Sequence, residues 1–132
     1  MILLDTHIWV NWILLGRNAL KPTIASAIED ADRVAVSAIS CFEVTLLVKG
    51  RKLELPFPTD EWINEALQPS AIECLPITCS ITQRSVNLTD IHRDPADRMI
   101  IATALEYGAQ LASYDTAFPN YPELSGCLLT GK

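Results

Sequence analysis

Residues 1–12, MILLDTHIWVNW, place an acid directly between a short apolar run and a longer hydrophobic segment. Ile2 to Leu4 has the length and composition of a buried strand, and Thr6 to about Leu15 is typical of a helix. Asp5 stands between them, either as a plain cap of the helix or as a side chain presented at the carboxyl end of the strand. The stretch therefore predicts a strand followed by a helix, the first unit of an α/β fold.

The rest of the chain repeats this alternation of short apolar runs and helical patterns, which is typical of a parallel sheet wrapped by helices. We expect a single three-layer domain over residues 1–132, with a central, mostly parallel sheet of four or five strands flanked by helices. The further expected helices span 22–32, 40–49, 61–67, 81–86 and 95–107, and the further expected strands span 33–37, 71–75, 109–114 and 127–129.

The composition argues against a membrane protein, a zinc protein and a general nucleic-acid coat protein. Hydrophobic residues make up 49% of the 132, but no run of 18 or more apolar residues occurs, so we expect a cytoplasmic chain that does not enter a membrane. The four cysteines form no CxxC pair, and with two histidines they build no zinc spacing, which indicates buried thiols in a reducing compartment. A net charge of −6 argues against a general nucleic-acid coat protein, unless acids gathered in one site hold a metal.

Four acids stand at or just beyond predicted strand ends. Asp5 and Asp115 follow strands directly, and each has a simpler interpretation as a cap or turn residue. Glu43 shares a helix face with the apolar positions at offsets −4, +3 and +4, a face expected to pack against the sheet. Asp97 begins an apolar stripe and also suits the helix dipole. Convergence of all four on one pocket explains them together, and such a pocket needs a hard cation, Mg²⁺ or Mn²⁺.

Four fragments carry a resemblance to a known family: LLDTH (3–7), VSAISCFEVTLL (36–47), HRDPADRMIIATA (92–104) and LASYDTAF (111–118). In this order and over nearly the whole chain, they resemble PIN-domain ribonucleases, and among these the VapC-type toxins of toxin–antitoxin pairs. The resemblance implies that the catalytic, metal-binding acids are Asp5, Glu43, Asp97 and Asp115. It also implies a metal-dependent endoribonuclease that leaves a 5′-phosphate and a 3′-hydroxyl, by attack of water activated by Mg²⁺ or Mn²⁺.

Several neighbours of these acids receive supporting roles. Thr6 matches the hydroxyl residue beside the first acid and is a hydrogen-bond donor to the ligands. Asp94 is either a water-mediated ligand or a loop cap, and we favour a cap or an outer-sphere role. Ser113 and Tyr114 depart from the threonine-rich family pattern before Asp115, and His7 receives no catalytic role.

RNA needs cations near such an acidic pocket. The candidate phosphate contacts are Arg98, which we favour, and Arg93, Lys49, Arg51 and Lys52. The alternatives are solvated surface charges and, for Arg98, an ion pair with Asp94. On resemblance alone, the substrate is structured RNA such as tRNA or rRNA.

The first helix is apolar almost all round, which favours a contact beyond the chain. The resemblance implies a VapB-like antitoxin and a homodimer, with Trp9 and Trp12 as partner-binding candidates and Phe57 and Trp62 as possible additions. The alternative places these aromatics in the core. Two rival functions remain open: a catalytically silent PIN-like interaction module, and a receiver-like phosphoryl-transfer domain that also uses Mg²⁺.

Overall fold

The computed structural model describes residues 1–68 and 71–131. Its sheet has five strands in the order β3-β2-β1-β4-β5, and every neighbouring pair is parallel. The strands are β1 (Ile2–Leu4), β2 (Val34–Ser37), β3 (Glu73–Leu75), β4 (Gln110–Ala112) and β5 (Leu128–Leu129). Because all strands run the same way, their carboxyl ends lie at one edge of the sheet. Asp5 follows β1 and Asp115 comes after β4, whereas Glu43 and Asp97 lie on helices.

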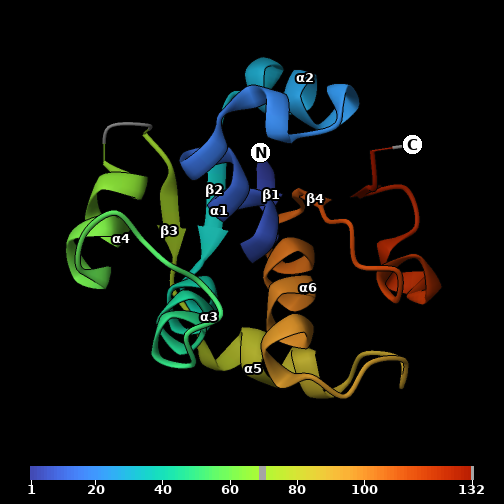
Figure 1. Cartoon of the computed structure of the whole chain (residues 1–132). Coiled ribbons are helices and arrows are strands. Elements are labelled where there is room, and N and C mark those ends of the chain that lie inside the picture. The colour runs from blue at the N-terminus through green and yellow to red at the C-terminus, as the bar shows by residue number, and fades with distance from the viewer. Residues whose placement is uncertain (69–70, 132) are drawn as a thin grey trace.

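Helices cover both faces of this sheet, as Figure 1 shows. The α-helices are α1 (Thr6–Leu15), α2 (Pro22–Asp30), α3 (Ala38–Lys49), α4 (Thr59–Leu67), α5 (Cys79–Val86) and α6 (Pro95–Tyr107), and short 3₁₀ turns lie at Arg17–Ala19, Phe118–Asn120 and Pro122–Leu124. Successive residues of β1 point to opposite faces. Ile2 and Leu4 join a core with α1, α2 and α4, whereas Leu3 joins a second core with α6 and the 3₁₀ turns near Tyr121. The predicted three-layer α/β fold is thereby confirmed.

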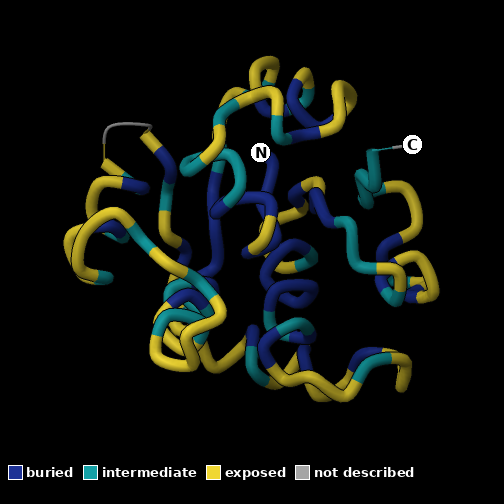
Figure 2. The backbone as a smooth tube through the Cα atoms, viewed as in Figure 1, coloured by how far each residue is buried: buried dark blue, intermediate teal, exposed yellow. Residues whose placement is uncertain are grey.

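Burial follows the layers, with the central strands and much of α6 buried beneath exposed helices and loops (Figure 2). Within residues 1–68 and 71–131, no helix is both long enough and apolar enough to span a bilayer.

The predicted boundaries differ from the structure by a few residues at several elements, and a side-chain cap accounts for the start of α3. α3 begins at Ala38 rather than residue 40, because the Ser37 hydroxyl accepts a hydrogen bond from the Ile39 N–H at 3.2 Å. β4 ends at Ala112, earlier than predicted, and the side chain of the next residue, Ser113, turns toward Asp5. α1 and α6 have the predicted bounds, and Gly108 ends α6 in the left-handed conformation with φ 61°.

Trp9, a predicted partner-binding candidate, and Trp62, a possible addition, lie in the core instead, which is the alternative that the sequence left open. Their exposed fractions are 0% and 2%, and their rings pack against each other with centroids 5.4 Å apart. The Trp9 indole N–H also donates to the carbonyl of Ala66 at 3.3 Å. Trp12 is half-buried against the same core, so the apolar residues of α1 are packed largely within the chain. Phe57 does remain 38% exposed.

Candidate metal centre

Asp5 is fixed at the carboxyl end of β1 by three neighbouring groups. Its Oδ1 accepts the Thr6 N–H at 2.8 Å, the cap of α1 that the sequence allows, and its Oδ2 accepts the Ser113 hydroxyl at 2.6 Å. The Asp5 N–H donates to the carbonyl of Ala112 at the end of β4. The residue is 6% exposed, and burial raises the pKa of its carboxyl above the usual value. Asp5 is therefore both a helix cap and a buried carboxylate.

Glu43 reaches the same place from α3. Thr6 Oγ1 lies 2.6 Å from Glu43 Oε1 and 2.8 Å from Ser40 Oγ. A hydroxyl carries one hydrogen and a carboxylate only accepts, so Thr6 donates to Glu43 and accepts from Ser40. Burial raises the pKa of Glu43 as well. The predicted apolar face is partly wrong: Leu46 is 51% exposed, so this side of α3 is only partly packed.

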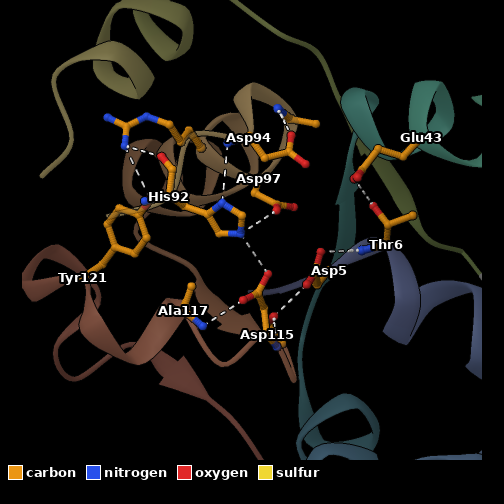
Figure 3. Close-up of polar contacts among 12 residues, drawn as sticks. Asp5, Thr6, Glu43, His92, Asp94, Asp97, Asp115, Ala117 and Tyr121 are labelled. Carbon is orange, nitrogen blue, oxygen red and sulfur yellow. Dashed lines mark hydrogen bonds and ion pairs between the residues drawn. The ribbon is translucent and has the colours of Figure 1, made fainter. Parts of the chain in front are cut away.

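Asp97 and Asp94 separate into two roles at the start of α6. Asp94 is exposed and caps the helix, because its Oδ1 accepts the Ala96 N–H at 2.9 Å. The Asp97 side chain is 15% exposed and points into the acidic cluster (Figure 3). Burial, followed by the charges of Asp94, Asp5, Glu43 and Asp115, raises the pKa of Asp97 to about 7. Asp94 therefore caps α6, whereas Asp97 contributes its carboxylate to the acidic cluster.

Asp115, the fourth predicted acid, is connected to the other acids through neighbouring side chains. Its Oδ1 accepts the Ala117 N–H at 2.8 Å, and its own N–H donates to the Ser113 hydroxyl at 3.0 Å. His92 Nε2 lies 3.4 Å from Asp115 Oδ2 and 3.2 Å from Asp97 Oδ2 (Figure 3). Ser113 and His92 thus connect Asp115 to the other acids, and neither was predicted from the sequence.

The donor atoms suit a divalent cation. One oxygen each from Asp5, Glu43 and Asp97 lie within 4.8 Å of one another, and His92, Asp97 and Asp115 form a second such group. Carboxylates held this close repel one another, which agrees with the raised pKa values, and a hard cation between them relieves that repulsion. The cluster lies at the strand edge where open α/β sheets bind ligands.

The family model of the PIN domain matches residues 2–124, which is most of the chain. The chain belongs to the PIN-domain family. Its sequence is 35% identical over 115 residues to Ribonuclease VapC22 of Mycobacterium tuberculosis (strain ATCC 25618 / H37Rv), covering 86% of each protein.

Solved structures agree at the level of the fold. A toxin–antitoxin complex from Klebsiella pneumoniae contains a chain with a TM-score of 0.71 at 22% identity, covering 100% of this PIN domain and 98% of that chain. VapBC2 from Rickettsia felis, bound to a DNA fragment from its promoter, gives 0.71 at 19% identity, covering 98% of both chains. FitAcB from Neisseria gonorrhoeae gives 0.63 at 22% identity, covering 99% of this chain and 98% of that one.

The prediction that Arg98 contacts RNA phosphate is wrong for this PIN domain. The residue is 9% exposed, and its guanidinium faces the loop between α5 and α6. It donates at 2.9–3.4 Å to the Tyr121 hydroxyl and to the carbonyls of Ser85, Val86, Leu88, Thr89 and His92. No side-chain ion pair with Asp94 is present in the described part of the chain, so that alternative also fails. The other basic candidates, Arg93, Lys49, Arg51 and Lys52, are all exposed.

Two contributors to the site had only faint signals in the sequence. His92 stands in the fragment HRDPADR, but a single histidine among acids carries no spacing rule of its own. Ser113 is visible as a small hydroxyl residue before Asp115, where its two hydrogen bonds join the first and last acids. Both roles depend on which strands are neighbours, which the sequence does not state.

Proposed function

We propose that this PIN domain is a metal-dependent endoribonuclease that acts as the toxin of a type II toxin–antitoxin pair. The observation that carries the proposal is the convergence of Asp5, Glu43 and Asp97 from β1, α3 and α6, with oxygens within 4.8 Å of one another. The relative named Ribonuclease VapC22 supports the same activity.

In this proposal Asp5, Glu43 and Asp97 would hold the cation, and Asp115 would complete the site. A bound Mg²⁺ or Mn²⁺ supplies a water of lowered pKa and neutralises charge on the scissile phosphate. The chain supplies the orientation: the Thr6 hydroxyl fixes one Glu43 oxygen, and Ser113 fixes one Asp5 oxygen. The proposed hydrolysis leaves a 5′-phosphate and a 3′-hydroxyl.

RNA can bind an acidic protein where basic side chains of the protein contact its phosphates. Arg93 is one residue from the Asp94 cap and is exposed, so it replaces Arg98 as the favoured phosphate contact. Lys49, Arg51 and Lys52 lie exposed at the end of α3 and give a second basic group. These residues confer affinity that does not depend on sequence. We propose structured RNA such as tRNA or rRNA as the substrate.

A protein partner suits the apolar surface that the fold leaves uncovered. Phe42 and Leu46 lie one turn apart on α3 and are 55% and 51% exposed. Phe57, in the segment between α3 and α4, is also exposed. We propose that this surface binds a VapB-like antitoxin, consistent with the toxin–antitoxin complexes among the structural neighbours. A homodimer remains a prediction, which light scattering of the purified chain tests.

Cleavage of a mixed RNA pool by the purified chain tests the proposal. Activity should need Mg²⁺ or Mn²⁺, stop with EDTA, and return when the metal is added in excess. Asp97→Asn removes a ligand oxygen and its charge, so cleavage should fall at least about 100-fold. Asp90→Asn makes the same charge change at an exposed loop position outside the cluster and should cleave like the parent.

The rival functions give different results in the same preparation. A silent interaction module cleaves no RNA with either metal. A receiver-like domain instead forms an acid-labile aspartyl phosphate with a small phosphodonor. Cleavage that persists in EDTA, or that Asp97→Asn leaves intact, contradicts the metal-dependent mechanism.

A further inference from the structure

His92 lies between two acids that come from different parts of the fold. Asp97 belongs to the first turn of α6, whereas Asp115 follows β4. The imidazole Nε2 is 3.2 Å from Asp97 Oδ2 and 3.4 Å from Asp115 Oδ2 (Figure 3). The imidazole is thus placed where these two like-charged groups approach each other.

The backbone of His92 is held by two buried side chains. Its N–H donates to the Tyr121 hydroxyl at 2.9 Å, and its carbonyl accepts from Arg98 Nη1 at 3.0 Å. Arg98 is 9% exposed and Tyr121 is 1% exposed. The loop that carries His92 is therefore fixed from within the protein, and the position of the imidazole is built into the fold.

The surroundings of the ring decide which nitrogen carries a hydrogen. A bare Nε2 lone pair would face two carboxylate oxygens and be repelled by both, whereas an Nε2–H is attracted by both. On the other side, Nδ1 lies 3.5 Å from the Asp94 N–H, which points at it as a donor. Both sides favour the tautomer with hydrogen on Nε2 and a free lone pair on Nδ1.

We propose that His92 is a positioning residue of the metal centre: its Nε2–H is shared between Asp97 and Asp115 and holds the two carboxylates together. The inference rests on the proposed function. Asp115 Oδ1 is already held by the Ala117 N–H, so the contact of Oδ2 with His92 determines how the carboxylate turns toward Asp97. Asp97 also belongs to the group with Asp5 and Glu43, so His92 connects Asp115 to the rest of the site.

The consequence concerns metal binding. Without a donor between them, Asp97 and Asp115 repel each other, and the Asp115 carboxylate keeps its Oδ1 contact with the Ala117 N–H but loses the contact that fixes Oδ2. Part of the binding free energy of the cation is then used to bring the two carboxylates together, so the observed affinity falls. Loss of an outer hydrogen bond of this kind typically weakens metal affinity about 10- to 100-fold.

The test compares two amides that differ by one methylene. In His92→Gln the amide nitrogen reaches about as far as Nε2, whereas in His92→Asn it reaches only about as far as Nδ1. Mn²⁺ affinity is measured from the electron paramagnetic resonance signal of the free aqua ion. We expect His92→Asn to bind Mn²⁺ at least about 10-fold more weakly than the parent, and His92→Gln to stay within about 3-fold. Circular dichroism and the unfolding midpoint in EDTA show that each variant is folded.

Three results overturn the role of His92. Equal Mn²⁺ affinity of parent and His92→Asn shows that the contact positions nothing. Tighter binding by His92→Asn shows that the imidazole blocks the cation. A ¹⁴N coupling to Mn²⁺ in the parent, lost in His92→Asn, shows a direct nitrogen ligand instead of a donor. A parent chain that binds no Mn²⁺ at all overturns the metal-dependent function together with this inference.

Discussion

Replacing Arg98 separates its structural role from contact with RNA. The guanidinium makes six hydrogen bonds at 2.9–3.4 Å, five of them to carbonyls of the segment from Ser85 to His92. In Arg98→Met the volume is roughly kept but every donor is lost. The bonds to the carbonyls of Ser85 and Leu88 are buried, so water does not readily replace the guanidinium there.

The expected cost follows from these contacts. Each buried polar group left unpaired costs about 1–3 kcal/mol, and the more exposed carbonyls cost less because water reaches them. We expect Arg98→Met to lower the free energy of unfolding by about 3–5 kcal/mol in urea titration with EDTA present. For a domain of this size, that is a fall in melting temperature of roughly 12–20 °C. Arg98→Lys keeps one cationic donor group and should lose less.

Arg93→Met is the matched control, because Arg93 is exposed in the same segment. It should change stability by no more than about 0.5 kcal/mol, while reducing the salt dependence of RNA binding by about one phosphate contact. The reasoning is refuted if Arg98→Met unfolds within about 1 kcal/mol of the parent and binds RNA with a reduced salt slope. Those two results together would show that Arg98 binds RNA phosphate and does not stabilise the fold.

The other predictions concern the acids and the core. Mn²⁺ must displace the proton of Asp97, whose pKa is about 7, so Mn²⁺ affinity should rise by up to about tenfold per pH unit below 7 and level off above it, as titrations from pH 5.5 to 8.5 measure. A raised carboxyl pKa favours the neutral form of Asp97 in the folded state. In EDTA, the stability that Asp97 contributes is therefore present at low pH and is lost as the pH rises from 3.8 to about 7. The urea midpoint should accordingly be higher at pH 5 than at pH 8. Saturating Mn²⁺ at about 100 times its Kd should add about 2.7 kcal/mol at pH 8, and no stabilisation there would contradict a metal site. Trp9→Ala should cost about 3–5 kcal/mol, whereas Phe42→Ala should cost little and instead weaken antitoxin binding measured by calorimetry.

Local rules in the sequence were sufficient for much of the fold. The apolar run before Asp5, the Asp94-Pro95 start of α6 and the Gly108 stop depend only on neighbouring residues, and each lies where it was predicted. The alternation of strands and helices also indicated the parallel sheet, because buried strands and amphipathic helices have different periods. The acids could be proposed as site residues because the predicted elements fix where each acid stands along the chain.

Arg98 shows where local rules fail. Its partners are mostly backbone carbonyls, which every residue type presents, so no sequence signal marks them. Trp9 shows the same limit, because a helix that is apolar all round can be covered by its own chain or by a partner, and only the position of Trp62 decides.

The sequence by itself determined the alternation of strands and helices, the candidate acids and, through the ordered fragments, the family. Tertiary structure alone decided which groups meet: pairing of β1 with β4 brings Ser113 to Asp5, although they are 108 positions apart, and the pinned loop brings His92 to Asp97 and Asp115. The reason is physical, since helix and strand patterns are set by contacts between near neighbours, whereas a site depends on distances that arise only after distant elements pack.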